Sequence, residues 1–128
     1  MIALRQPLPT LLLLSGDKSL ASLVREASGP GWRVEHVEDA QGGELFARPN
    51  IRLVVVDDEL IGEGDRGWLL GQIRARQAGV PLMYVTAFHD PENEKRARAG
   101  GAHYYTSKPL DKGRFVQVLQ SFLKARGT

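Results

Sequence analysis

Three polar residues stand at the ends of apolar segments, and together they could handle a phosphoryl group. Asp57 follows the apolar run 53–56, Thr86 lies near the end of the segment 80–87, and Lys108 precedes a proline. A carboxylate can accept a phosphoryl group as an acyl phosphate, while a hydroxyl and an ammonium can bind its oxygens. Each residue alone is weak evidence, but their order and spacing favour phosphoryl chemistry.

Bringing these residues together requires a framework in which separate segments end at one place. The short apolar runs 11–14 and 53–56 are typical of strands that are covered on both faces, as in parallel sheets. Three further segments, rich in β-branched or aromatic residues, complete a set of five predicted strands: 32–37, 80–87 and 103–107. The carboxyl ends of parallel strands meet at one edge of the sheet, so the three polar residues are expected there.

Segments with helical periodicity separate the predicted strands. Four predicted helices each begin after an aspartate, a favoured capping residue, at positions 17, 65, 90 and 111. A short segment over 40–47, which contains two glycines, completes a set of five helices. This alternation predicts an α/β doubly wound three-layer sandwich, with a five-stranded parallel sheet in the order 2-1-3-4-5 and helices on both faces.

Length and composition limit the class of protein. The 128 residues suit one domain, which we assign to 10–128 after an N-terminal extension over 1–9. Seventeen Lys and Arg against fifteen Asp and Glu leave a net charge of +2, too small to predict a nucleic-acid partner. The chain has no cysteine and no apolar run near the ~20 residues that span a bilayer. We therefore expect a cytoplasmic protein with no membrane partner.

Three motifs resemble the receiver domain of bacterial two-component response regulators, the CheY-like family. They are RLVVVDDEL at 52–60, VPLMYVTA at 80–87 and GAHYYTSKP at 101–109. The resemblance covers residues 10–124 and implies a phosphorelay signalling domain rather than an enzyme. By this resemblance, Asp57 accepts the phosphoryl group, while Thr86 and Lys108 bind it.

The resemblance also implies a set of partners and a switch. A histidine kinase or a histidine phosphotransfer protein would supply the phosphoryl group, and a downstream protein or effector domain would bind the fourth predicted helix, the fifth strand and the fifth helix. Tyr105 matches the family's switch residue, and the Lys108–Pro109 peptide bond is expected to be cis. We expect Arg96 and Arg98 to lie on or beside the docking face. A homodimer is also compatible with the resemblance.

One departure from the family concerns its metal site. Two adjacent acidic residues usually end the first strand and hold Mg²⁺, but Ser15 and Gly16 occupy those places here. Asp17 follows one position later and is the remaining side-chain candidate beside Asp57, while Glu59 could contribute its backbone carbonyl. With so few anionic ligands, we expect an impaired site that binds Mg²⁺ weakly or not at all.

Three alternatives remain open at the level of sequence. The chain could be a pseudo-receiver that signals by docking without phosphorylation. A haloacid-dehalogenase-like phosphatase also places an aspartate after a buried strand, but it needs a second aspartate two residues on, where Glu59 stands. A flavodoxin-like FMN binder needs a phosphate loop, of which 15–19 is a thin version. In each case Asp58, next to Asp57, is expected to face solvent, because adjacent strand residues point to opposite faces.

Overall fold

The computed structural model describes residues 8–38 and 50–127, which form a five-stranded sheet with helices on both faces. The sheet order is β2-β1-β3-β4-β5, and every neighbouring pair is parallel. The strands are β1 (Thr10–Leu14), β2 (Arg33–Val37), β3 (Ile51–Asp57), β4 (Leu82–Thr86) and β5 (Tyr104–Ser107). The predicted fold class and strand order are confirmed.

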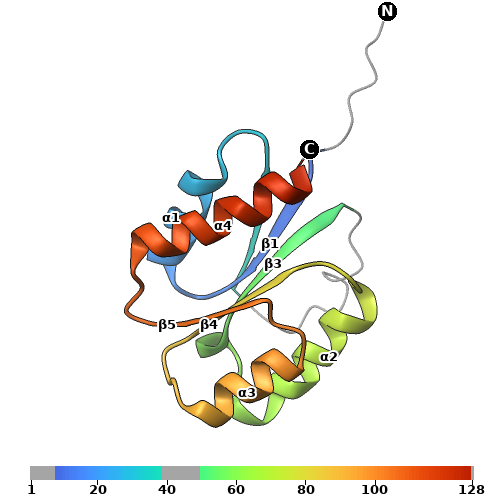
Figure 1. The fold of residues 1–128 in the computed structure, drawn as a ribbon, viewed down its shortest axis with the longest axis vertical. Helices are drawn as coiled ribbons and strands as arrows, with labels where there is room; N and C mark the ends of the chain where they lie inside the picture. The colour runs from blue at the N-terminus through green and yellow to red at the C-terminus, as the bar shows by residue number, and fades with distance from the viewer. Residues whose placement is uncertain (1–7, 39–49, 128) are drawn as a thin grey trace, which may run out of the picture.

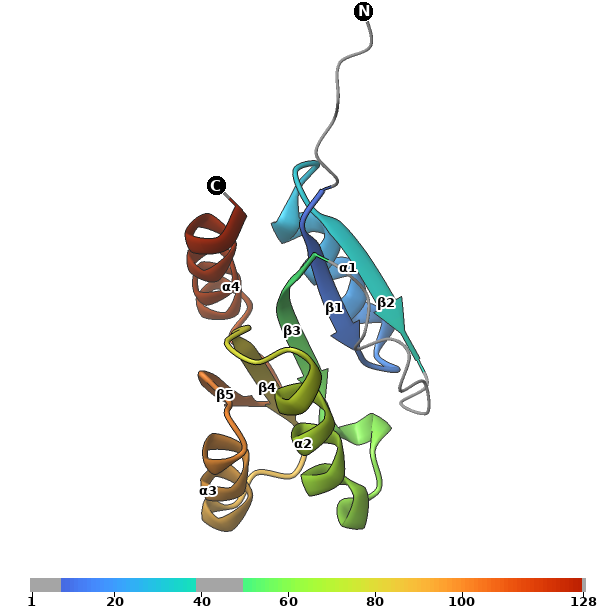
Figure 2. The same ribbon diagram turned by 90° about the vertical axis from the view of Figure 1, so that its right-hand side faces the viewer.

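The helices divide between the two faces of the sheet. They are α1 (Lys18–Ser28), α2 (Arg66–Arg76), α3 (Pro91–Ala99) and α4 (Lys112–Gly127), and two short 3₁₀ turns, η2 (Asp58–Leu60) and η3 (Glu63–Asp65), precede α2. Figures 1 and 2 show α1 and α4 on one face and α2 and α3 on the other. The predicted helix over 40–47 and most of the predicted extension over 1–9 lie outside the described residues.

Aspartate side chains begin three of these helices as predicted. Asp17 Oδ1 accepts hydrogen bonds from the backbone N–H groups of Ser19 and Leu20, and Asp90 and Asp111 bind the first turns of α3 and α4 in the same way. Asp65 precedes α2 but makes no capping hydrogen bond, so that predicted contact is wrong. Its ψ of −5° is already close to helical, because η3 leads directly into α2, whereas a capping residue needs extended backbone.

The apolar strands separate two layers of core. All five residues of β1 are buried, as are six of the seven in β3, which explains their unbroken apolar sequences. On the α1 and α4 side, the helices contribute large apolar side chains: Leu20, Val24, Phe115, Leu119 and Leu123. On the other side, the buried apolar residues of the helices are Leu69, Leu70 and Ile73 from α2 and Ala97 from α3. Across residues 8–38 and 50–127, no helix combines the length and the apolar character that a membrane crossing requires.

Candidate functional site

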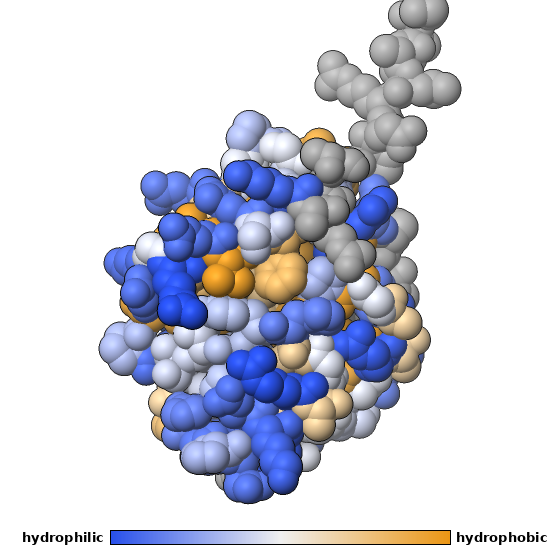
Figure 3. All heavy atoms as spheres, viewed as in Figure 1, coloured by the Kyte–Doolittle hydropathy of each residue, from blue (hydrophilic) through white to orange (hydrophobic). Residues whose placement is uncertain are grey.

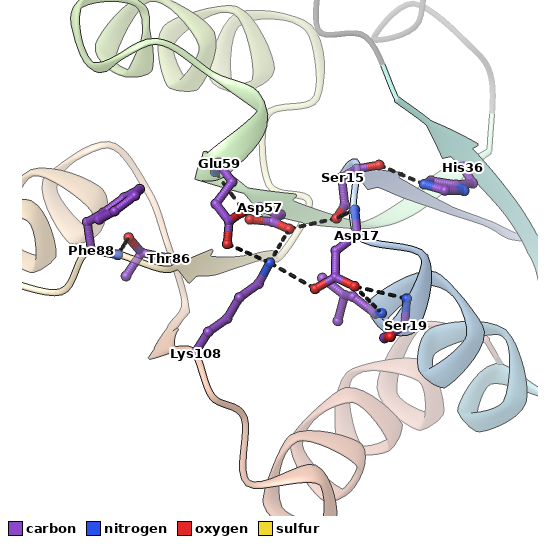
Figure 4. Close-up of polar contacts among 10 residues, drawn as sticks. Ser15, Asp17, Ser19, His36, Asp57, Glu59, Thr86, Phe88 and Lys108 are labelled. Carbon is purple, nitrogen blue, oxygen red and sulfur yellow. Dashed lines mark hydrogen bonds and ion pairs between the residues drawn. The ribbon is translucent and has the colours of Figure 1, made fainter.

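The carboxyl edge of the sheet brings Asp57 and Lys108 together. Asp57 ends the central strand β3 and is fully buried, and Lys108 lies just beyond β5. The Nζ of Lys108 is 2.8 Å from Asp57 Oδ2, and Figure 4 draws the contact between the two side chains as a dashed line. The peptide bond that joins Lys108 to Pro109 is cis, as predicted. Two residues that are far apart in the sequence thus meet at one point, as the parallel sheet requires.

Two further carboxylates bind the same ammonium group. Asp17 Oδ2 and Glu59 Oε1 each lie 3.0 Å from Lys108 Nζ (Figure 4). Burial alone would lower the pKa of Lys108, but hydrogen bonds to the three carboxylates outweigh it and raise the pKa well above its ordinary value. The hydrogen bond from Lys108 in turn lowers the pKa of Asp17. Lys108 is therefore a protonated cation held by three acidic side chains.

Ser15 is a site residue that the sequence interpretation missed. Its buried hydroxyl donates a 2.7 Å hydrogen bond to Asp57 Oδ2, the oxygen that also binds Lys108. Asp57 Oδ1 accepts the backbone N–H of Glu59 at 3.2 Å, so both carboxylate oxygens are engaged. The sequence interpretation treated Ser15 as a missing acid and, in the FMN-binding alternative, as part of a thin phosphate loop, but not as a partner of Asp57. A polar residue directly after an unbroken apolar strand is the signal that could have identified it.

The acidic residues considered as metal ligands are arranged around the ammonium group. Asp17 uses one oxygen to cap α1 and the other to bind Lys108. The side chain of Glu59, which had no predicted role, also binds Lys108. Within 8–38 and 50–127 there is no group of three or more His, Cys, Asp or Glu that could hold a metal ion. As arranged, these residues fit an ammonium cation and do not fit Mg²⁺, which requires an octahedral shell of oxygens.

The Thr86 hydroxyl forms its hydrogen bonds away from the side chains of Asp57 and Lys108, although the Thr86 backbone carbonyl accepts the Lys108 N–H at 2.8 Å. Its hydroxyl oxygen accepts the backbone N–H of Phe88 at 3.0 Å and the side-chain amide of Asn93 at 3.2 Å. Figure 4 shows Thr86 at the end of its strand, to one side of the carboxylates around Lys108. In this state Thr86 is connected to the start of α3.

Asp58 is fully buried, so the prediction that it faces solvent is wrong. Its Oδ2 accepts hydrogen bonds from the Tyr84 hydroxyl at 2.9 Å and the Asn93 amide at 3.3 Å, and Arg66 Nε lies 3.6 Å away. Adjacent strand residues do point to opposite faces, but both faces of this sheet are covered by helices. The turn η2 directs the Asp58 side chain toward α2 and α3.

Tyr105 also belongs to this buried polar cluster, which consists of Asp58, Tyr84, Thr86, Asn93 and Tyr105. It is 9% exposed and stacks on Tyr84, with ring centroids 5.7 Å apart. Its hydroxyl contacts His89 Nδ1 at 3.0 Å and the Asn93 amide at 3.4 Å, and burial raises its pKa. The amide of Asn93 thus connects Asp58, Thr86 and Tyr105, which no sequence pattern indicated.

The arginines predicted for a docking face lie on α3. Arg96 and Arg98 are both exposed, and Arg98 forms an ion pair with Glu94 at 2.9 Å. The switch role of Tyr105 and the docking role of these arginines stay predictions.

Comparisons with known proteins identify relatives of this chain. It is 34% identical over 77 residues to the polar-differentiation response regulator DivK of Brucella anthropi, a match that covers 59% of this chain and 61% of that protein. With DivK of Brucella ovis it shares 41% identity over 44 residues, covering 34% of this chain and 36% of that protein. The matched part therefore spans less than two thirds of these relatives. No family model matches the chain.

Solved structures extend the likeness to nearly the whole chain. The HemR receiver domain of Leptospira biflexa, in its non-phosphorylated form, has a TM-score of 0.75 and 26% identity, covering 90% of this chain and 94% of that one. A CheY-like response regulator receiver domain of Methanospirillum hungatei JF-1 has a TM-score of 0.77 and 19% identity, covering 94% and 97%. At 19% identity this second likeness describes the fold.

Proposed function

We propose that this chain, which belongs to the response regulator receiver domains of two-component signalling, accepts a phosphoryl group on Asp57. The observation that carries the proposal is the 2.8 Å contact between Lys108 Nζ and the buried carboxylate that ends the central strand. A fixed ammonium beside a carboxylate can neutralise the charge of an incoming phosphoryl group. Ser15 holds the same carboxylate oxygen in place.

The proposed donor is a phosphohistidine of a kinase or a phosphotransfer protein. A carboxylate oxygen of Asp57 attacks the phosphorus atom, the phosphorus–nitrogen bond breaks, and the imidazole keeps the electron pair. The product is an acyl phosphate whose oxygens Lys108 can bind. The Thr86 hydroxyl now accepts hydrogen bonds from Phe88 and Asn93, and its own O–H would have to turn toward this group to donate to it.

Weak Mg²⁺ binding is part of this proposal. Mg²⁺, when bound to a receiver, supplies positive charge for the transferred group. Here Ser15 and Gly16 stand in place of the usual acids, and the carboxylates of Asp17, Asp57 and Glu59 are occupied by Lys108. We therefore infer slow modification by small phosphodonors such as acetyl phosphate.

One observation favours a second candidate, a pseudo-receiver that docks without phosphorylation. Both oxygens of Asp57 already accept hydrogen bonds, from Ser15, Lys108 and the Glu59 backbone. To attack a phosphorus atom, the carboxylate of Asp57 would have to lose one or more of these hydrogen bonds. In this case a downstream protein still binds the docking surface predicted from the sequence, which α3, β5 and α4 form. It binds the unphosphorylated chain, with no change of state at Asp57. A homodimer through this surface and a cytoplasmic location are further parts of the proposal.

The test treats the intact chain with acetyl phosphate and Mg²⁺ and measures its mass. We expect slow addition of one phosphoryl group to the wild type and none to D57N. No addition under any condition, even with phosphohistidine donors, would favour the pseudo-receiver. Turnover of a generic phosphoester would instead favour a phosphatase, and a bound yellow chromophore would favour an FMN protein.

Restoring the missing acids sharpens the test. Gly16 does not have a positive φ, and a Cβ at this position would meet Leu60 Cδ1 at an ordinary 4.0 Å, so G16D should be tolerated. S15D places a second carboxylate against the buried Asp57, so it should lower stability until Mg²⁺ is added. We expect the double variant to bind Mg²⁺ more tightly and to be phosphorylated faster. Strong Mg²⁺ binding by the wild type would contradict the impaired site.

A further inference from the structure

A groove between α2 and α3 has the size and the lining of a ligand site. Its volume is about 700 Å³, within the range of small-molecule pockets. Apolar side chains from Leu70 and Ala97 line it, together with the guanidinium-bearing residues Arg66, Arg74 and Arg96. We refer to it as the arginine groove. Figure 3 shows hydrophilic side chains over α3, at the bottom of that view.

Glycines from two parts of the chain line the groove. Gly64, Gly67 and Gly71, spaced three and four residues apart, line it from η3 and α2. Gly100 and Gly101 line it from the end of α3, where Gly101 has a φ of +106° and a Cβ would collide with the Arg74 guanidinium. At Gly100 a Cβ would come within 2.8 Å of Leu70 Cδ1. The first three glycines therefore leave open space, because a Cβ there would meet nothing within 4 Å, whereas the two glycines after α3 allow Leu70 and Arg74 to approach closely.

The groove carries a surplus of positive charge. Among its described lining residues, three are arginines and none is acidic. Arg66 is only 15% exposed and faces the buried Asp58 at 3.6 Å, which offsets one charge. Arg74 is half-buried, and its Nη2 donates to a backbone carbonyl, that of Gly101, at 2.9 Å. Arg96 has no ion pair with any residue in the described ranges. The half-buried guanidinium group of Arg74 and the exposed one of Arg96 are therefore not compensated by carboxylates in the described ranges.

We propose that the arginine groove binds an organic phosphate, a small molecule with both a phosphate group and an apolar portion. A guanidinium group matches phosphate oxygens with paired hydrogen bonds, and three of them suit a group with several anionic oxygens. Leu70, Ala97 and the glycine backbones offer an apolar surface to the rest of the molecule. Charge and shape select the same class of ligand.

The groove also touches the buried polar cluster. Tyr84 and Asn93 line it, and both donate hydrogen bonds to Asp58 Oδ2. Asn93 donates to Thr86 as well. A ligand held between α2 and α3 would therefore restrain the start of α3. Binding itself does not depend on phosphorylation of Asp57, so the D57N variant should retain it.

The test is an NMR titration of the full ¹⁵N-labelled chain with ADP, pyrophosphate or adenosine, without divalent cations. We expect ADP to shift the amide signals of Gly67, Gly71, Gly100 and Gly101. It should bind about tenfold more tightly than either adenosine or pyrophosphate, because each of those lacks one half of the contacts. R96E should weaken ADP binding by about tenfold or more, whereas K95E, with the same charge change on α3 outside the groove, should alter it by less than about twofold.

A second pair of variants tests the space itself. A Cβ at Gly71 meets nothing within 4 Å, so both G71A and G71L should fold. G71L should block ADP while G71A should retain most of its binding. Equal losses for R96E and K95E would show only diffuse electrostatic attraction and overturn the proposal. Equal binding of ADP and pyrophosphate, or binding of a poly-glutamate peptide with no response to ADP, would also overturn it. Failure of Asp57 phosphorylation would leave these results unchanged.

Discussion

The two faces of the sheet are packed by different kinds of side chain. On one face, α1 and α4 bury aliphatic and aromatic residues such as Val24, Phe115 and Leu119 against the strands. On the other face, α2 buries Leu69, Leu70 and Ile73, but α3 buries only Asn93 and Ala97, and both helices border the arginine groove. Hydrophobic burial is the main source of stability, so α3 is expected to be held less firmly than α1 and α4.

The chemistry follows the same division. Lys108 joins β5 to the start of α1 through Asp17, which reinforces the firmly packed face at the sheet edge. Asp58, Thr86 and Tyr105 meet through the amide of Asn93 on the other face. Because Asp58 directly follows Asp57 in the chain, this cluster connects the end of β3 to α3, which buries few side chains. The difference teaches that two helices of one sheet can be held by very different side chains, large and apolar in α4 and small or polar in α3.

Matched leucine truncations should give the largest effect. L119A removes a fully buried side chain beneath α4, and we expect a loss of about 4 kcal/mol in the free energy of unfolding. L70A should cost about 2 kcal/mol, because water and neighbouring groups can enter from the groove. Equilibrium urea unfolding measures both. Equal losses would remove the distinction between the faces.

For buried polar residues, the larger loss of unfolding free energy is expected on the α2 and α3 face. N93A leaves acceptors on Asp58, Thr86 and Tyr105 without their shared donor, so we expect it to cost about 2 kcal/mol. S28A on α1 removes a bond to a helical carbonyl, that of Val24, and should cost about 0.5 kcal/mol. The same urea measurement applies. An N93A variant as stable as S28A would show that the cluster contributes nothing.

Local opening should separate the faces without any mutation. Amide protons of α3 are expected to exchange about tenfold or more faster than those in the middle of α4, because α3 buries so few side chains. Native-state hydrogen exchange followed by NMR measures this ratio. Protection of α3 equal to that of β3 would contradict the mobility that we assign to it.

The smallest effect concerns the charges at the sheet edge. Because the hydrogen bond from Lys108 lowers the pKa of Asp17, this pair stabilises the fold above the ordinary aspartate value and loses that effect as pH falls through the lowered value. K108M should raise the pKa of Asp17 and make the acid loss of stability shallower. A ¹³C carboxyl titration measures the shift. Lys112 is an exposed lysine nearby that forms no ion pair with Asp17, so K112M should leave the pKa of Asp17 unchanged. An unchanged pKa of Asp17 in K108M would contradict the ion pair.

The sequence alone indicated most of the fold, because the relevant signals are local. Unbroken apolar runs marked the covered strands, aspartates marked the starts of helices, and their alternation implied the sheet order. The meeting of Asp57 with Lys108 and the cis bond before Pro109 also followed, from strand order and from family resemblance. The missing cap at Asp65 shows the limit of this reasoning, since its backbone is set by the turn before it.

Only the tertiary structure decided which polar groups share a site. Ser15 and Asp57 lie 42 positions apart, and their hydrogen bond depends on the register of β1 against β3. Asp58 is buried because helices cover the face of the sheet to which it points. The alternation of residues along a strand predicts which face a side chain points to, but not whether a helix covers that face. The arginine groove is lined by glycines of α2 together with glycines that follow α3, two segments that only the fold brings together. Local sequence determines periodicity and caps, whereas contacts between distant elements arise only when their side chains pack together.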